Sequence, residues 1–305
     1  MPTFSYQTQI LDTLPPAVRP LIENMLFKQA GVLYAAQVED LLTVWGIDRD
    51  TLVERLLPFA AACAVAPISS FYVGVIIEGE SGNFYMGANM EFVGGFLGLS
   101  IHGEQAAINN AWLHGEKAIR GLTVNAAPCG HCRQFLHELN SSDTMQVTVI
   151  SPAGRHSAAL SHYLPEAFGP TDLGIKTSIL SSARSTITLD KRADLNDPLV
   201  ALAAQAAAQS YAPYSNGHAG IALETRDGIR VVGRYAEIAA YNPSLQPLAS
   251  ALSQLRFQCL GKDVDIQRVV IVEKSTHVDH MSHIAAMRNW LSDNRMLEVE
   301  HFFCH

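Results

Sequence analysis

Two short stretches of the sequence carry residue types that could do chemistry together. In "SIHGEQAAI", His102 stands two residues before Glu104, and in "APCGHCRQF", Cys129 and Cys132 are three residues apart behind a proline. That spacing turns both sulfurs to one side of the first turn of a helix, and the positive end of the helix favours their thiolate forms. Taken alone, the cysteine pair fits a redox site, a structural zinc site or two packed thiols.

The histidine favours zinc over the other interpretations. His102 begins another helix of the same unit, and two soft thiolates with an imidazole suit tetrahedral zinc. A structural site would need a fourth protein ligand, and the sequence offers none with useful spacing. An open fourth position is typical of catalytic zinc. Glu104 would face that position and carry protons; the alternative is a solvent-exposed glutamate near a helix start.

The composition is that of a globular protein with a sizeable core. Of 305 residues, 48% are hydrophobic and 16% are charged, which argues against disorder and predicts two or three structural units. The formal net charge is -8, and the sequence has no run of Lys and Arg. Because phosphate binding needs clustered basic residues, nucleic acid is not expected as a partner.

Targeting and redox features predict a cytoplasmic protein. The first residues, "MPTFSYQTQIL", lack the basic start and apolar run of a secretory signal. The apolar stretch 59–68 is too short to span a bilayer and contains Pro67, so no membrane partner is expected. The cysteines show no disulfide-like spacing. We expect those outside the motif to be inert thiols, namely Cys63, Cys259 and Cys304.

The chain repeats itself at a fixed offset. "ISSFYVGVIIEG", which begins at Ile68, matches "YSNGHAGIALET", which begins at Tyr214, an offset of 146 residues. The matched positions are a proline (67 and 213), a serine (69 and 215), three glycines (74, 82 and 87 with 220, 228 and 233) and two glutamates (78 and 91 with 224 and 237). Shared glycines and a shared proline indicate the same turns, so we predict a duplicated domain.

Each copy has the pattern of an α/β unit. An apolar helix ("DTLVERLLPFAAACAV", "DPLVALAAQAAAQSYA") precedes two strands joined by a glycine turn, and further helices and a strand follow. Such alternation predicts a layered sheet. We divide the chain into an N-terminal helical segment (1–48), a zinc-binding domain (49–150), a connecting segment (151–190) and a second, degenerate domain (191–305). The connection contains "YLPEAFGP", which is apolar enough to pack against another element.

The second copy is expected to lack the metal-binding and proton-carrying side chains. With the offset of 146 carried onward, the positions that match His102, Cys129, Cys132 and Glu104 are Leu248, Ser275, Val278 and Ser250, in that order. None of these residues is a good zinc ligand. We therefore predict one zinc ion per chain.

The two motifs together resemble the cytidine deaminase family, whose zinc-dependent pattern is shared by nucleobase deaminases. The residues that carry the resemblance are "HGE" followed by "PCGHC", and "FYMGANMEF" and "YLPEAFGP" make the chain similar to the dimeric bacterial type. The family usually has Ala where Gly103 stands. The resemblance covers nearly the whole chain. It implies two copies of a three-layer α/β/α domain, each a mixed sheet flanked by helices, with a small N-terminal helical segment.

The resemblance also implies roles for the motif residues. His102, Cys129 and Cys132 would hold Zn²⁺, and water would attack C4 of the cytosine ring. Glu104 would take a proton from that water, protonate N3 and help ammonia leave. The expected reaction is hydrolytic deamination of cytidine and 2′-deoxycytidine in pyrimidine salvage. The alternatives are a polynucleotide cytosine or adenine deaminase, which the net charge argues against, and a structural zinc module without catalysis.

Further residues receive substrate-binding roles by the same resemblance. Asn89 and Glu91 would hydrogen-bond the ribose, chiefly its 3′-hydroxyl, and the backbone carbonyl of Ala127 would accept the substrate amino group. Phe71 would stack near the pyrimidine; the alternative for it is core packing. Arg133 could donate hydrogen bonds to the thiolates, or it could lie on the surface.

Other histidines are not expected to bind metal. "HVDHMSH" spaces His277, His280 and His283 three residues apart, and we interpret it as a solvated polar segment. His131, between the two cysteines, should point away from the metal.

The resemblance implies a homodimer. Single-copy relatives are tetramers whose active sites are completed by neighbouring subunits, and a duplicated chain would reach the same four-domain assembly as a dimer. We expect "RYAEIAAYN" (234–242) to line the partner's active site.

Overall fold

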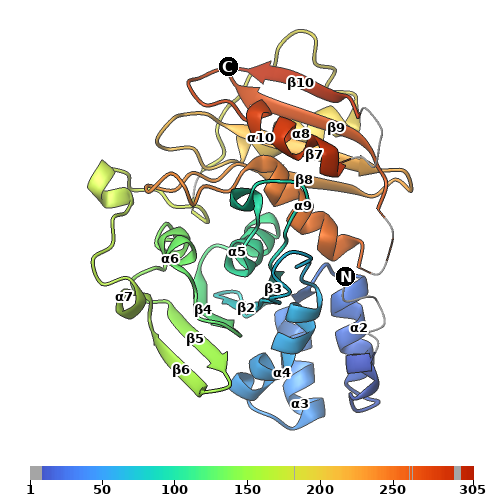
Figure 1. Cartoon of the computed structure of the whole chain (residues 1–305), viewed down its shortest axis with the longest axis vertical. Helices are drawn as coiled ribbons and strands as arrows, with labels where there is room; N and C mark the ends of the chain where they lie inside the picture. The colour runs from blue at the N-terminus through green and yellow to red at the C-terminus, as the bar shows by residue number, and fades with distance from the viewer. Residues whose placement is uncertain (1–8, 182, 261, 263, 292–296) are drawn as a thin grey trace.

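The structure is a computed structural model that describes the chain except residues 1–8, 182, 261, 263 and 292–296 and the side chains of 288–291. It contains two separate sheets, one in each copy of the repeat (Figure 1). In the described part of the chain, no helix is long and apolar enough to cross a membrane.

The first sheet has six strands in the order β1-β3-β2-β4-β5-β6. Strands β4 and β5 are parallel, and the other neighbouring pairs are antiparallel, so the sheet is mixed. The strands are β1 (Val32–Leu33), β2 (Gly74–Gly79), β3 (Phe84–Ala88), β4 (Ile119–Val124), β5 (Gln146–Ser151) and β6 (Gly154–Ala159).

Side chains alternate across β2, and this alternation builds a helical layer on each face. Val75 and Ile77 join the core that contains α5 (Gly103–Leu113) and α6 (Gly130–Leu136). Ile76 joins a second core, under α4 (Arg49–Ala62). Successive residues of a strand point to opposite faces, so an apolar run such as "VII" is buried on both. The expected three-layer α/β/α arrangement is confirmed.

The second sheet repeats the central four strands of the first. Its order is β10-β9-β7-β8, and β9 and β10 are parallel as β4 and β5 are. The ladder shifts register at matched places, between Glu78 and Gly79 in the first copy and between Glu224 and Thr225 in the second. The strands are β7 (Ala219–Thr225), β8 (Arg230–Arg234), β9 (Ile266–Lys274) and β10 (Val299–Cys304).

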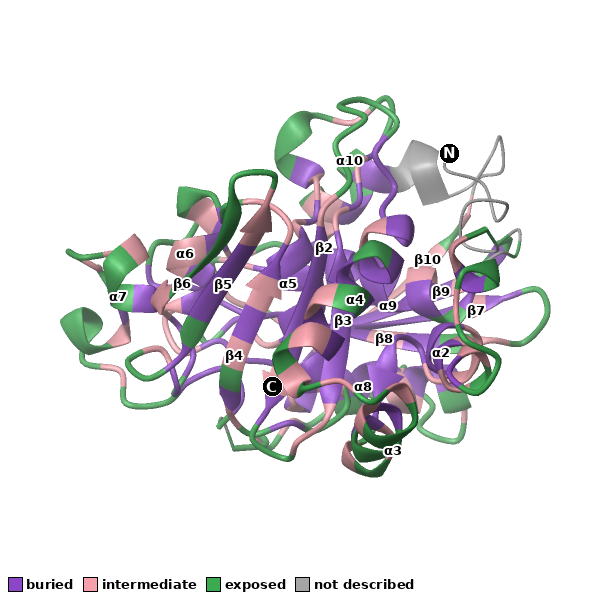
Figure 2. Ribbon diagram, turned by 90° about the horizontal axis from the view of Figure 1, so that it is seen from below, coloured by how far each residue is buried: buried purple, intermediate pink, exposed green. Residues whose placement is uncertain are grey.

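Helices α5 and α9 (Pro247–Gln258) pack against each other between the two sheets (Figure 1). Every residue from Gly103 to Trp112 is buried, and the central elements are the most buried part of the molecule (Figure 2). The core around α5 also includes Ile221, Leu223 and Leu252 of the second copy. A helix that lacks a polar face is suited to burial on all sides, and "GEQAAINNAWL" has small or uncharged residues at almost every position.

Helix ends follow local signals in the sequence. The Asp48 side chain accepts a hydrogen bond from the Thr51 amide (2.7 Å) and caps α4, and the Asp197 side chain caps α8 (2.8 Å to the Leu199 amide). Acceptors at this position satisfy the free amides of the first turn. The remaining helices are α2 (Arg19–Phe27), α3 (Ala35–Trp45), α7 (Leu160–Tyr163), α8 (Pro198–Ala208) and α10 (Met281–Leu291), with 3₁₀ turns at Leu97–Leu99 and Pro170–Leu173.

The segments outside the two repeats contribute to the first domain more than expected. Strand β1, within the predicted N-terminal helical segment, pairs with β3. Strand β6 and helix α7 lie inside the predicted connecting segment 151–190, and β6 adds an edge strand to the first sheet. The first sheet therefore continues to Ala159. The sequence gives no apolar signal for this strand, because "GRHSAA" is polar and exposed, as an edge strand can be.

Two glycines in each copy sit where a helix touches the sheet. A Cβ at Gly74 would overlap the Ala61 backbone, and one at Gly220 would overlap the Ala207 backbone, at the same offset of 146. Gly87 lies against the backbones of Gly103 and Ala107 in α5, and Gly233 occupies the matching place beneath α9. The repeated glycines are thus required by close approach of helix and strand backbones.

The offset between the copies changes after the second strand, which corrects the sequence alignment. Met90 pairs with Ile101, and Ala236 pairs with Leu245. The first members differ by 146 and the second by 144, so the intervening loop is two residues shorter in the second copy. Across β4 and β9 the offset is 147, since Val75 pairs with Val124 and Ile221 with Ile271. Loops absorb such length changes because they lie outside the packed layers.

We predict that Gly87→Ala lowers the free energy of unfolding by about 3 kcal/mol, the upper part of the range for overpacked sites. The new methyl group would force β3 away from the first turn of α5. Thermal and denaturant unfolding of the two proteins would measure the loss.

Gly121→Ala in β4 is the matched control, because its Cβ would have only the Gln146 carbonyl oxygen near it, at 3.5 Å. This variant should stay within about 0.5 kcal/mol of the parent. Equal losses in both variants would contradict the close-approach explanation.

Candidate active site

The starts of two helices bring the candidate metal ligands together. His102 is the N-cap residue of α5, and Cys129 is the N-cap residue of α6, with Cys132 in its first turn. His102 Nδ1 lies 3.5 Å from Cys129 Sγ and 3.3 Å from Cys132 Sγ, and the two sulfurs are 3.6 Å apart. These three side chains form the one group of at least three potential metal ligands found in the described residues.

The geometry fits a single zinc ion. With Zn–N and Zn–S bonds of about 2.0 and 2.3 Å, tetrahedral ligands lie about 3.5–3.8 Å from one another, close to the separations observed. The ligand set is partly open to solvent, since Cys129 is exposed and His102 is half-buried, whereas Cys132 is fully buried. A soft N,S,S donor set with room for a fourth ligand suits catalytic zinc.

The two thiols are electrostatically unequal. A hydrogen bond between the sulfurs is the largest influence on both, and it lowers the pKa of Cys129 to about 4 and raises the pKa of Cys132. His102 and backbone amides of the α6 start further favour the Cys129 thiolate. One thiolate is thus available near neutral pH before any metal binds, and a metal would replace the remaining proton.

Glu104 lies in the first turn of α5, beside the ligands, and is 4% exposed. Burial raises the pKa of its carboxyl, although its own backbone amide and the side chain of Cys132 act to lower it. A raised pKa makes the carboxylate a better proton acceptor, as a group that carries protons requires. The alternative of a solvent-exposed glutamate at a helix start is therefore wrong.

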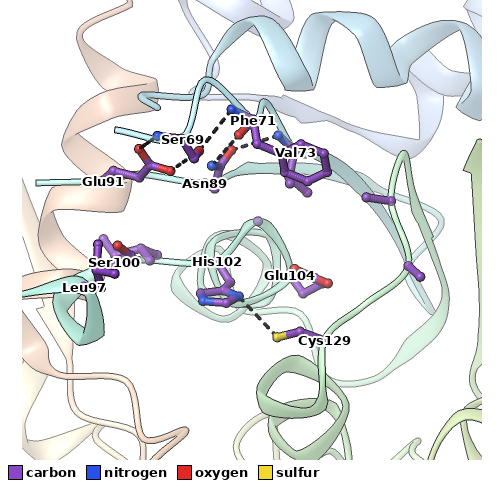
Figure 3. Close-up of a pocket in the computed structure, with 14 residues that line it drawn as sticks. Ser69, Phe71, Val73, Asn89, Glu91, Leu97, Ser100, His102, Glu104 and Cys129 are labelled. Carbon is purple, nitrogen blue, oxygen red and sulfur yellow. Dashed lines mark hydrogen bonds between the residues drawn. The ribbon is translucent and has the colours of Figure 1, made fainter. Parts of the chain in front are cut away.

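These groups face a cavity of about 470 Å³ (Figure 3). Its size suits a small organic ligand. The lining residues are Ser69, Phe71, Val73, Asn89, Glu91, Leu97, Ser100, Ile101, His102, Gly103, Glu104, Ala126, Ala127 and Cys129. All of the predicted catalytic, metal-binding and substrate-binding residues except Cys132 are among them.

The Glu91 carboxylate lies at one wall of the cavity and is held there by hydrogen bonds from a neighbouring loop. It accepts hydrogen bonds from the amides of Ile68 (2.9 Å) and Ser69 (3.0 Å) and from the Ser69 hydroxyl. Partial burial acts to raise its pKa, but these donors outweigh burial and lower it. The carboxylate is therefore ionised at neutral pH and is held in one orientation.

Asn89 fixes the neighbouring loop. Its side-chain oxygen accepts a hydrogen bond from the Val73 amide (2.8 Å), and its nitrogen donates to the Phe71 carbonyl (2.9 Å; Figure 3). The loop holds the Phe71 ring at the cavity, where it is 58% exposed. Core packing, the alternative for Phe71, is therefore wrong.

Ser69 is a site residue that the sequence prediction missed. Its hydroxyl bonds Glu91, and in the second copy the Ser215 hydroxyl bonds Glu237 in the same way, with matching amide bonds from Tyr214 and Ser215. The serine and glutamate positions were both matched in the repeat. The two matches taken together indicate a serine that bonds a glutamate in each copy.

Space is limited at Gly103, where the motif usually has alanine. A Cβ there would lie 3.0 Å from side-chain carbons of both Val73 and Val75. Real Cβ contacts are seldom this short, so an alanine would require these valines to move.

Arg133 binds backbone rather than sulfur. Among the described residues its Nε donates to the Pro128 carbonyl (2.8 Å) and its Nη1 to the Tyr163 carbonyl (2.9 Å), with the guanidinium 5.5 Å from the Tyr163 ring. The expected donation to the thiolates is not observed. Arg133 instead ties the loop before Cys129 to α7.

His131 lies closer to the site than expected. Its ring centroid is 5.2 Å from that of His102, and its Nε2 is buried without a hydrogen-bond partner among the described residues. Burial lowers its pKa, and the nearby His102 lowers it further. It does not belong to the ligand cluster of the described residues.

The matching place in the second copy is closed by its own side chains. With the corrected offset, Gln246 at the N-cap of α9 corresponds to His102, and Leu248 corresponds to Glu104. Helix α10 begins after His280 as α6 begins after Cys129. His280 contacts Gln246 (Nδ1 to Oε1, 3.0 Å) and the Gly217 carbonyl (3.1 Å).

These equivalences replace the earlier ones, which assigned Leu248, Ser250, Ser275 and Val278. The Tyr235 ring packs edge-on against His280, 4.3 Å between centroids, where Asn89 stands in the first copy. His280 is 1% exposed, so the prediction of a solvated polar segment is wrong for it, whereas His277 is exposed.

The chain matches known proteins over most of its length. A model described as "Cytidine and deoxycytidylate deaminase zinc-binding region" matches residues 48–148, and a second model with the same description matches residues 160–286. Among curated proteins, "Cytidine deaminase" of Sodalis glossinidius is 48% identical over 96% of this chain and 92% of its own length. "Cytidine deaminase" of Pectobacterium carotovorum is 43% identical over 97% of this chain and 96% of its own length.

Solved structures give shorter matches. A cytidine deaminase from Burkholderia pseudomallei is 27% identical and covers 40% of this chain and 100% of its own, with a TM-score of 0.37. The ligand cluster lies inside the first zinc-binding-region match, and the two matches together with 48% identity over 96% of the chain cover both copies of the repeat. On this evidence, the chain belongs to the cytidine deaminase family.

Proposed function

We propose that His102, Cys129 and Cys132 hold the zinc ion of this zinc-dependent cytidine deaminase and that Glu104 carries its protons. The reaction is the hydrolytic deamination of cytidine and 2′-deoxycytidine to uridine and 2′-deoxyuridine, with release of ammonia. The observation that carries the residue assignment is the convergence of three ligand atoms and a buried carboxyl at one cavity.

The side chains divide the chemistry between them. When bound, zinc would act as a Lewis acid that lowers the pKa of the attacking water to near neutral. Glu104 accepts a proton from that water and donates one to N3 of the ring as the new C4–O bond forms. Glu104 then takes the remaining proton from the new C4 hydroxyl and delivers it to the amino group, so that the C4–N4 bond breaks, the C4 carbonyl forms and ammonia leaves. The raised pKa of Glu104 suits a group that must both accept and donate.

Substrate contacts follow from the other walls of the cavity. We propose that Glu91 and Asn89 hydrogen-bond the ribose, that Phe71 stacks near the base, and that the Ala127 carbonyl accepts the substrate amino group. Support comes from their shared cavity and from the fixed orientation of the Glu91 carboxylate. An ionised carboxylate accepts two hydroxyl bonds, so it favours a nucleoside over a free base.

We predict that Glu104→Gln keeps its zinc and loses about 10⁴-fold or more in kcat, because an amide cannot shuttle protons. The absorbance change of cytidine would measure turnover, and elemental analysis would measure zinc.

Cys132→Ser is the complementary variant. It should lose both zinc and turnover while Glu104 is intact, so the pair separates proton transfer from metal binding. A Glu104→Gln protein that retained a third of the parent rate would remove Glu104 from the role.

A second prediction concerns the ribose. Glu91→Ala should lower kcat/KM for cytidine about 10- to 100-fold, as expected for losing a hydrogen bond to a charged group worth about 1.5–3 kcal/mol, with unchanged zinc content. Ser69→Ala is the matched control: it removes the hydroxyl's bonds to Glu91 and to the Phe71 amide but leaves the carboxylate, so its loss should be several-fold smaller. Parent-like kinetics of Glu91→Ala on both nucleosides would exclude the contact.

We further propose a homodimer in which the partner covers the mouth of the cavity and residues 234–242 contribute to the partner's site. Large apolar side chains are exposed at or near that mouth, namely Phe71 (58%), Val93 (67%), Phe96 (64%) and Leu97 (71%). A monomer rarely exposes such a cluster without a partner. Tyr241, at 66% exposure, remains free to reach another chain.

Light scattering should give twice the mass of one chain, which is 33.2 kDa. Elemental analysis should find one zinc ion per chain. Leu97→Asp should shift the protein toward monomer and reduce activity. An active monomer, or two tightly bound zinc ions per chain, would contradict the proposal.

We also propose that the reaction belongs to pyrimidine salvage in the cytoplasm. All five cysteines are free, and those outside the motif are buried, which suits a reducing compartment. Recovery of the activity in an exported fraction of cells would contradict this location.

A further inference from the structure

The side chain of Gln105 connects the histidine ligand to the second domain. It follows Glu104 in the first turn of α5 and is 4% exposed. Its Oε1 accepts a hydrogen bond from the His102 backbone amide (3.3 Å), and its Nε2 donates to the Pro243 carbonyl (2.9 Å). One amide group thus spans from the residue that bears the imidazole to the backbone of the other copy.

The contact with His102 orients the ligand itself. His102 is the N-cap residue of α5, with an extended backbone (φ −85°, ψ 153°). A glutamine at the third helical position that bonds the N-cap amide sets the angle at which the chain enters the helix. The direction of the His102 side chain depends on that angle, and so does the distance from Nδ1 to the two sulfurs.

The Nε2 end of the Gln105 amide donates to a carbonyl whose loop is bonded to the first domain. Pro243 lies in the loop between β8 and α9, and this loop is tied to the first domain by the Ala239 amide, which donates to buried Glu138 (3.0 Å). The carbonyl to which Gln105 donates therefore belongs to a loop that is itself bonded to the first domain.

We propose that Gln105 is a positioning residue through which the second domain, by the Pro243 carbonyl, holds the His102 ligand in register with the cysteines. This inference rests on the proposed zinc site. It assigns the degenerate copy a direct part in the geometry of the active site, in addition to covering the core. Groups that orient metal ligands from the outside commonly change metal affinity or activity by about 10- to 100-fold when removed.

The helix offers a matched control one turn further on. Asn109 is 1% exposed and also bonds the second domain: its Nδ2 donates to the Ser250 carbonyl (3.0 Å), and its Oδ1 accepts from the Ser250 hydroxyl (2.6 Å). It contacts α9 but not the start of α5. Asn109→Leu therefore removes at least as much polar contact between the domains and leaves His102 alone.

The test measures zinc release as well as turnover. Purified zinc-loaded protein would be mixed with a chromogenic chelator at a temperature well below unfolding. We expect Gln105→Met to release zinc about 10-fold faster than the parent, and kcat to fall about 10-fold with KM for cytidine changed less than twofold. Asn109→Leu should lower the unfolding temperature but change zinc release and kcat less than twofold.

A second variant guards against misfolding of the first. Gln105→Asn is one methylene too short to join His102 to Pro243, stays polar, and should change zinc release and kcat in the same direction. If the Gln105 variants release zinc at the parent rate, or no faster than Asn109→Leu, the inference is overturned. A parent protein that binds no zinc would instead overturn the proposed function, so the two failures are distinguishable.

Discussion

The burial of α5 between two sheets is the constraint on which the rest of the molecule depends. On the face of α5 toward the first sheet, Gly87 lets β3 approach the helix backbone. On another face, α5 packs on α9 of the second copy. A helix enclosed in this way cannot rotate or shift without disturbing the core that the two copies share around it. Its first turn therefore provides a fixed platform, and His102, Glu104 and Gln105 stand on that turn.

Burial also decides the chemistry of the platform. Glu104 is removed from water by the same packing that fixes the helix, and the resulting desolvation raises its pKa. The two proposed cysteine ligands come from the start of α6, where Cys129 is exposed and Cys132 is enclosed. The proposed metal site thus lies where two helix N-termini meet at one end of the parallel pair β4 and β5.

The two copies have kept the same scaffold and have diverged at the site. Glu91 with Ser69 and Glu237 with Ser215 form the same hydrogen bonds, so this network serves the turn in both copies. A role for Glu91 with substrate would be added to that structural role. In the second copy a tyrosine, a histidine and a glutamine fill the place that is a cavity in the first.

The sequence alone determined the family, the α/β class, the duplication and the three metal-binding candidates, because each depends on local spacing. Histidine, glutamate and two cysteines at fixed separations, and glycines repeated at one offset, are visible without any contact map. The layered sheet was predicted from the alternation of helices and strands in each copy. The edge strand β6 was not visible, since its polar residues give no apolar signal.

Only the tertiary structure decided which residues of the second copy stand at the site and what Arg133 and Gln105 contact. A two-residue difference in the loop before α9 moves the match of His102 from Leu248 to Gln246, and loop length leaves no periodic trace in a sequence. Arg133 reaches carbonyl oxygens rather than thiolates because the side-chain direction is fixed by the packing of α6 against α7. The bond from Gln105 to Pro243 joins residues 138 positions apart, and such a contact exists only once two domains have packed together.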